Sequence, residues 1–195
     1  PMAIVLHSLK QAAPQIGETA AVFGAGPIGL LTMFVLKLTG AARVWAVEPV
    51  AHRREMARAL GADAVIDPAA ADPVREIRSD SGGRGVDLAL DCAAKGDTLN
   101  QSIRVVRRGG RFVLTGIPAG SHYWLDIDTL RQEEIAFLNV RRSSDESQTA
   151  LELVGLHRAR LAPILTHRFP LDGIQRAFEM LLRYEDGAGK ILIKP

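Results

Sequence analysis

Three glycines and one glutamate have the types and spacing that bind a dinucleotide. Gly24, Gly26 and Gly29 follow the apolar stretch 19–23, and Glu48 ends a second apolar stretch nineteen residues after the last glycine. In this pattern the first glycine permits a tight turn, the second lets backbone amides approach a pyrophosphate, and the third lets a helix lie against the strand. The glutamate suits a ribose 2′-hydroxyl and repels a 2′-phosphate. These residues predict a site for NAD.

The residue after the second glycine indicates where a helix begins. Pro27 is suited to a first helical turn, where its missing N–H would have no intrahelical partner. Phosphates at this point would face the positive end of the helix. Two alternatives stay open: a turn without a ligand, and a turn that binds S-adenosylmethionine. The full three-glycine spacing argues against the second.

The elements that position these residues alternate between apolar strands and helical patterns. This alternation predicts an α/β fold, a Rossmann-type doubly wound parallel sheet of about six strands in the order 3-2-1-4-5-6. Its ligand crevice would lie at the carboxyl ends of strands one and four. The predicted strands are 19–24, 43–48, 63–66, 86–91, 111–115 and 135–140. The predicted helices are 27–39, 51–60, 72–79, 97–107 and 146–156.

Several segments lie between or outside these elements. The glycine-rich segments 81–85 and 108–110 predict turns that introduce the next strands. Residues 1–12 predict an amphipathic helix. Region 161–195 predicts extended segments near 164–170 and 190–194 on either side of a helix near 173–184. Neither this region nor residues 1–12 has a sheet of its own to complete. The predicted dinucleotide-binding domain is 13–142.

Composition excludes several classes of protein. The 195 residues carry a net charge of +2 and are 47% hydrophobic, which is ordinary for a soluble globular protein. The arginines are too scattered for a nucleic-acid surface. No apolar run reaches the roughly 18 residues of a membrane span, and no signal peptide is evident, so we expect a cytoplasmic protein. Cys92 is the only cysteine and the five histidines are far apart, so the sequence predicts no metal site.

The chain resembles a known family over essentially its whole length. Segments 24–30 and 47–67 resemble the coenzyme domain of medium-chain, zinc-containing alcohol dehydrogenases, and 165–179 with 189–195 are similar to its sorbitol and threonine dehydrogenase branch. The resemblance implies the NAD-binding half of an enzyme that moves hydride between a secondary alcohol or polyol and NAD. It also implies that 1–12 and 143–195 belong to a catalytic domain whose zinc-binding part is missing. Zinc is therefore expected in the intact enzyme and not in this chain.

The resemblance also implies roles for individual residues. The three glycines match a pyrophosphate loop with donors near Pro27 and Ile28, and Glu48 matches an acidic ribose ligand that is usually aspartate. Arg53 matches an arginine near the adenosine. His7 matches a recurring histidine of the branch, although a packed core residue is its simpler interpretation. The remaining implied cofactor contacts are Cys92 near the riboses, Thr115, Gly116 and Ile117 near the carboxamide, and Arg142 in the cofactor or substrate cleft.

Three functional hypotheses stay open at this stage. The first is the NAD-binding half of a zinc-dependent alcohol or polyol dehydrogenase, whose individual small-molecule substrate the sequence does not name. The second is a stand-alone nucleotide-binding module without catalysis. The third is a zinc-free quinone reductase-like enzyme, against which Glu48 argues because such enzymes prefer NADPH. Since 135–140 would be an apolar edge strand, we also expect a homodimer that pairs these strands, with no nucleic-acid or membrane partner.

Overall fold

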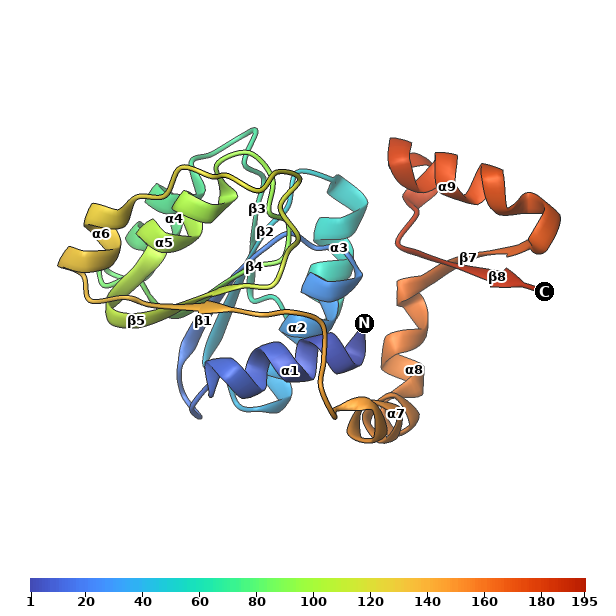
Figure 1. Cartoon of the computed structure of the whole chain (residues 1–195), viewed down its shortest axis with the longest axis horizontal. Helices are drawn as coiled ribbons and strands as arrows, with labels where there is room; N and C mark the ends of the chain where they lie inside the picture. The colour runs from blue at the N-terminus through green and yellow to red at the C-terminus, as the bar shows by residue number, and fades with distance from the viewer.

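A six-stranded sheet forms the centre of the computed structural model, which describes residues 1–195 (Figure 1). Its strand order is β3-β2-β1-β4-β5-β6, and every neighbouring pair runs parallel. The strands are β1 (Thr19–Phe23), β2 (Arg43–Val47), β3 (Ala64–Ile66), β4 (Val86–Asp91), β5 (Val106–Leu114) and β6 (Ala136–Asn139). The predicted doubly wound fold and its strand order are confirmed.

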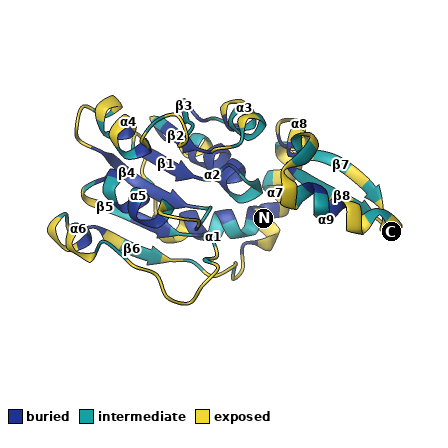
Figure 2. Ribbon diagram, turned by 90° about the horizontal axis from the view of Figure 1, so that it is seen from above, coloured by how far each residue is buried: buried dark blue, intermediate teal, exposed yellow.

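Helices cover both faces of this sheet (Figure 2). They are α1 (Met2–Ala12), α2 (Pro27–Leu38), α3 (Ala51–Ala59), α4 (Pro73–Asp80), α5 (Thr98–Val105), α6 (Ile127–Gln132), α7 (Ser147–Leu156), α8 (Arg158–Leu161) and α9 (Ile174–Arg183). The predicted helices are found within a few residues of their expected bounds, and α6 and α8 were not predicted. No helix combines the length and the apolar character needed to cross a bilayer.

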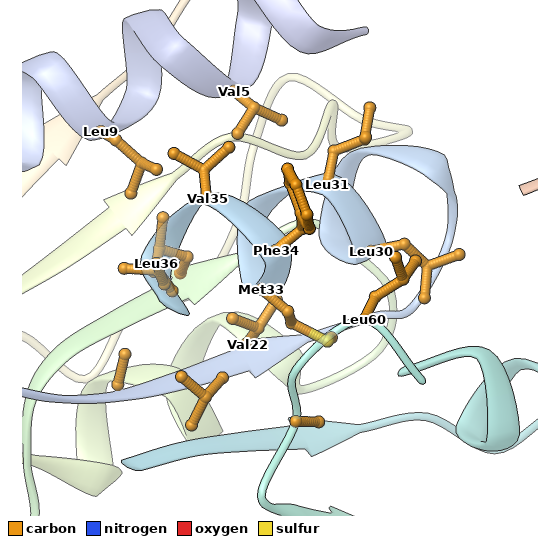
Figure 3. Close-up of a cluster of buried hydrophobic side chains, with 14 of the residues drawn as sticks. Val5, Leu9, Val22, Leu30, Leu31, Met33, Phe34, Val35, Leu36 and Leu60 are labelled. Carbon is orange, nitrogen blue, oxygen red and sulfur yellow. The ribbon is translucent and has the colours of Figure 1, made fainter. Parts of the chain in front are cut away.

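Two hydrophobic cores lie on opposite faces of the sheet because successive strand residues point to opposite sides. In β1, Ala20 and Val22 face one core, while Ala21 and Phe23 face the other. Figure 3 shows the first core, in which α2 packs between β1 and α1. The second core lies under α4, α5 and α6. Strands buried on both faces explain the continuous apolar runs in the sequence.

The start of β5 differs from its prediction. Segment 108–110 was expected to be a turn before the strand, but it lies inside β5 as an irregularity in the pairing with β4. Gly109 has a φ of +67°, and a Cβ on Gly110 would lie 2.9 Å from the carbonyl oxygen of Asp87. The glycines therefore let the chain bulge beside β4 and then resume pairing at Arg111.

The C-terminal part forms a second unit of β7 (Leu165–Pro170), α9 and β8 (Lys190–Lys194). The two strands pair in parallel, so the expectation that this part has no sheet of its own is wrong. Both views show this unit beside the six-stranded sheet, connected to it through α7 and α8 (Figures 1 and 2). Short 3-10 turns at Ala162–Ile164, Leu171–Gly173 and Glu185–Gly187 join its elements.

Candidate cofactor-binding site

The glycine-rich turn lies between β1 and α2, and each glycine meets a different requirement. Gly24 has a φ of +94°, and its N–H donates to the carbonyl oxygen of Val47 at 2.8 Å. A Cβ on Gly29 would lie 1.9 Å from the carbonyl oxygen of Gly24, so only glycine lets α2 pack this closely. A Cβ on Gly26 would meet nothing within 4 Å. The first and third glycines thus serve the fold, whereas the second leaves open space in front of the turn.

The start of α2 offers backbone donors to this open space. Pro27 is the first helical residue, and the N-cap Gly26 provides no side-chain cap. Leu30 N–H donates to the Gly26 carbonyl oxygen, so the first-turn amides without helical partners are those of Ile28 and Gly29. These amides and the positive end of the helix dipole favour an anion at this position.

A cleft of about 490 Å³ borders this turn at the carboxyl ends of β1, β2 and β4. A crevice at the carboxyl ends of the strands, where the strand order reverses, is where doubly wound folds bind nucleotides. The cleft contains five of the residues that the sequence singled out: Gly24, Gly26, Glu48, Arg53 and Cys92. Its other lining residues are Val47, Pro49, Val50, Pro68, Ala93, Lys95, Thr98, Gln101 and Tyr184.

Glu48 is buried, with only 3% of its surface exposed, and it holds the glycine-rich turn in place. Its Oε2 accepts a hydrogen bond from Ala25 N–H at 2.7 Å, and its Oε1 accepts one from Val50 N–H at 3.0 Å. A carboxylate has about four acceptor positions, so both oxygens can still accept a ribose hydroxyl. The sequence did not reveal that Glu48 holds the turn, because the positions of the two amide donors depend on the folded path of the chain.

Cys92 lies at the entrance of the loop after β4, and its thiol is not a nucleophile. The Sγ is 3.9 Å from Thr32 Oγ1 on α2. Burial raises the pKa of the Cys92 thiol to about 12, so it stays protonated near neutral pH. Cys92 can contribute packing to a cofactor site, but it does not contribute covalent chemistry.

Asp91 organises the same loop, although the sequence analysis did not single it out. Its carboxylate accepts hydrogen bonds from the N–H groups of Ala93 and Ala94 at 2.9 and 2.8 Å, and from Thr98 Oγ1 at 2.8 Å. Burial raises its pKa, and these hydrogen bonds oppose that effect. An aspartate directly after an apolar strand and before small residues is the sequence signal for such a loop.

The C-terminal unit reaches the cleft through Tyr184. The guanidinium carbon of Arg53 lies 4.6 Å from the centre of the Tyr184 ring, and Lys95 Nζ donates to Tyr184 Oη at 2.8 Å. The sequence singled out Arg53 but missed Lys95 and Tyr184. The cleft is consequently formed by both units of the chain.

Seven predicted contacts do not line the cleft: Pro27, Ile28 and Gly29 in the first turn of α2, and Thr115, Gly116, Ile117 and Arg142. The amides of Thr115 and Gly116 both donate to the carbonyl oxygen of Asp91, which places them beside the end of β4, and Thr115 Oγ1 donates to a serine of α1. Ile117 is 90% exposed. Arg142 is exposed and has a φ of +57°.

His7 links α1 to the segment before α7 and does not belong to the cleft. Its Nδ1 lies 2.9 Å from Glu146 Oε1, and Glu146 also accepts a hydrogen bond from Ser144 N–H at 2.8 Å. The hydrogen bond with His7 holds the pKa of Glu146 at about 2, well below its ordinary value. His7 therefore has a structural partner.

A zinc ion does not fit the residues of this chain. Nowhere do three or more histidine, cysteine, aspartate or glutamate side chains gather into a metal-binding group. The donor set that a catalytic zinc needs is three protein ligands with one open position. We therefore derive no chemical step through zinc from this chain.

Comparison with known proteins places the chain in a family. Residues 27–155 match the model of the zinc-binding dehydrogenases. The L-threonine 3-dehydrogenase of Caldanaerobacter subterraneus is 35% identical over 184 residues, which cover 92% of this chain and 52% of that protein. The sorbitol dehydrogenase of Bacillus subtilis is 26% identical over 195 residues, covering 100% of this chain and 55% of that protein.

A solved structure agrees with this assignment. A zinc-binding dehydrogenase of Sinorhizobium meliloti, determined with bound NADP, superposes with a TM-score of 0.91 at 29% identity, covering 100% of this chain and 57% of that one. The chain thus spans about half the length of the curated relatives it matches. The resemblance seen in the sequence is confirmed, and the chain belongs to the zinc-binding dehydrogenase family.

Proposed function

We propose that this chain binds NAD and acts as the coenzyme-binding part of a dehydrogenase for a secondary alcohol or polyol. One observation carries the proposal: a glycine-rich turn and a buried carboxylate line one cleft at the carboxyl ends of β1 and β4, and the turn leads directly into a helix whose first amides have no helical partner. The family and its threonine and sorbitol dehydrogenase relatives support the substrate class.

The cofactor site follows from the chemistry of the donors. The pyrophosphate would bind the amides of Ile28 and Gly29, and the open space at Gly26 would admit its oxygens. Glu48 would accept the ribose hydroxyls of the adenosine half. When bound, the nicotinamide ring supplies hydride transfer, while the chain binds and orients the cofactor. We keep Thr115, Gly116 and Ile117, which directly follow β5, as proposed contacts of the nicotinamide half, and Arg142 as a proposed cleft residue.

The preference for NAD over NADP rests on Glu48. A dianionic 2′-phosphate would lie beside a buried carboxylate, and like charges in such surroundings repel strongly. Arg53 and Lys95 in the same cleft act in the opposite direction, and the Sinorhizobium relative holds NADP. Because Glu48 is buried beside the turn itself, we expect its repulsion of the 2′-phosphate to exceed the attraction from Arg53 and Lys95.

Calorimetric titration of the chain with NAD and NADP tests the proposal. We expect one site per chain and NAD affinity higher by roughly an order of magnitude, about 1.4 kcal/mol. Glu48→Gln should reduce the ratio of the two affinities, because it removes the repulsive charge. Asp67→Asn, a carboxylate outside the cleft that pairs with Arg54, is the control. Failure to bind either dinucleotide would refute the proposal, and an unchanged ratio in Glu48→Gln would refute the role of Glu48.

We also propose that the chain forms a homodimer through β6. This strand lies at the edge of the sheet and pairs only with β5. Unpaired strand edges invite pairing with another chain, and a twofold arrangement would bury the same edge on both copies.

A further inference from the structure

The cleft carries one aromatic side chain that comes from outside the six-stranded sheet. Tyr184 directly follows α9 in the C-terminal unit, yet it lines the same cleft as Glu48 and Gly26. Its backbone adopts the left-handed region at φ 54° and ψ 34°, which is uncommon for a residue with a Cβ. The turn after α9 thus places this side chain against the other unit of the chain.

Two cations hold the Tyr184 ring in this position. The Arg53 guanidinium carbon lies 4.6 Å from the ring centre, within the range of a cation–π contact. Lys95 Nζ donates to the phenol oxygen at 2.8 Å, so its 5.6 Å separation from the ring centre reflects contact at the hydroxyl end. Arg53 follows β2 and Lys95 follows β4. Because β2 and β4 flank the central strand β1, the Tyr184 ring is held by residues from both sides of that strand.

Arg53 also has a hydrogen-bond donor that no group of the chain uses. Its Nε is buried without a partner, while one terminal nitrogen makes a long contact of 3.5 Å to the Ala188 carbonyl oxygen. Buried polar groups without partners are rare in folded proteins. Arg53 therefore keeps an unused donor in the side chain that contacts the Tyr184 ring.

We infer that Tyr184, held by Arg53 and Lys95, forms part of the adenosine-binding surface and packs against the purine base. The inference rests on the proposed function. Glu48 marks the ribose of the adenosine half, and Arg53 lies five residues further along the chain. Tyr184 is 39% exposed, so part of its ring is accessible to a base, and aromatic rings stack well on purines. Binding of the adenosine half would then fasten the C-terminal unit to the six-stranded sheet.

The test is calorimetric titration of the whole chain with AMP, NAD and nicotinamide mononucleotide. Tyr184→Ala should weaken AMP and NAD by the same factor, about tenfold, which is typical of losing one base–aromatic contact, and should leave the mononucleotide unchanged. Tyr184→Phe keeps the ring and should lose less. Phe178→Ala is the matched control, because this aromatic residue of α9 is 58% exposed and does not line the cleft.

The possible results separate this inference from the proposed function. If the wild-type chain binds neither AMP nor NAD, the proposed function fails together with the inference. If the wild-type chain binds both and Tyr184→Ala binds AMP equally well or more tightly, only the inference is overturned. If Tyr184→Ala does not fold, as judged by circular dichroism, Tyr184→Leu removes the aromatic face with less loss of volume. The same tenfold expectation applies to it.

Discussion

Two alanine substitutions in the glycine-rich turn should separate folding from cofactor binding. In Gly29→Ala the new Cβ would lie 1.9 Å from the Gly24 carbonyl oxygen and 2.9 Å from its carbon. Ordinary contacts are about 3.5–4.0 Å, so α2 would have to move away from β1 by roughly 1.5 Å. This helix carries the fully buried Leu30, Met33 and Phe34, whose packing against the sheet would loosen.

The loss of unfolding free energy in Gly29→Ala follows from the kind of clash. Overpacking in a core costs about 1–3 kcal/mol and occasionally more, and a backbone oxygen cannot rotate away as a side chain can. We therefore expect Gly29→Ala to lose about 3 kcal/mol of unfolding free energy. For a chain of this size each kcal/mol lowers the Tm by about 2–4 °C, which gives a decrease of about 6–12 °C.

Gly26→Ala should behave in the opposite way. Gly26 has a φ of −69° and no neighbour within 4 Å of its Cβ position, so alanine fits without strain. Stability should stay within about 0.5 kcal/mol of the wild type. The methyl group would stand where the pyrophosphate approaches, so NAD affinity should fall at least about tenfold. Thermal unfolding and calorimetry measure the two effects. Wild-type NAD affinity in Gly26→Ala, or wild-type stability in Gly29→Ala, would refute the reasoning.

Three further predictions concern acid stability, assembly and activity. The pKa of Glu146 is lowered to about 2, so its pairing with His7 stabilises the fold fully above its ordinary pKa and is lost as the pH falls toward 2. The Tm difference between wild type and Glu146→Gln should accordingly shrink on acidification, and a constant difference would argue against the pairing. Light scattering at tens of micromolar should show a dimer, because the free edges of two β6 strands would pair. Asn139→Pro in β6 should yield monomers, because Val140 N–H donates to β5 and the N–H of its neighbour Asn139 faces the free edge. A monomeric wild type would exclude the interface. The chain should produce no NADH from sorbitol, threonine or secondary alcohols with added zinc, because it has no metal-binding group. An intact homologue serves as the positive control, and zinc-dependent turnover by this chain would contradict the expectation.

The sequence predicted those parts of the fold that depend on local patterns. The central strands β1, β2 and β4 are mostly apolar and buried, and strands buried on both faces must read that way, so they could be predicted. The strand order followed from the alternation of strands and helices. The helix α6 was missed because it has six residues, of which only Leu130 is buried. The glycines at 109 and 110 resemble a turn in sequence, and only the pairing of Val106 with Val86 shows that the strand has already begun.

The same distinction applies to the candidate site. The turn glycines and Glu48 were found because their roles depend on one strand–helix–strand segment. Tyr184 was missed because it lies 89 residues beyond Lys95, and nothing local indicates that the C-terminal unit returns to the cleft. The second role of Glu48, as acceptor for the amides of Ala25 and Val50, was missed because it needs the folded geometry of the turn.

The structure of the chain determined with NAD tests the central claim most directly. We predict that the pyrophosphate lies against the amides of Ile28 and Gly29 at the start of α2, with the adenosine ribose beside Glu48 and Arg53. A dinucleotide bound elsewhere would contradict this account, for example in the apolar cavity of about 470 Å³ between the helices α1, α2, α7 and α8 and the C-terminal unit. A crystal grown at saturating NAD that shows no cofactor in the cleft would contradict it equally.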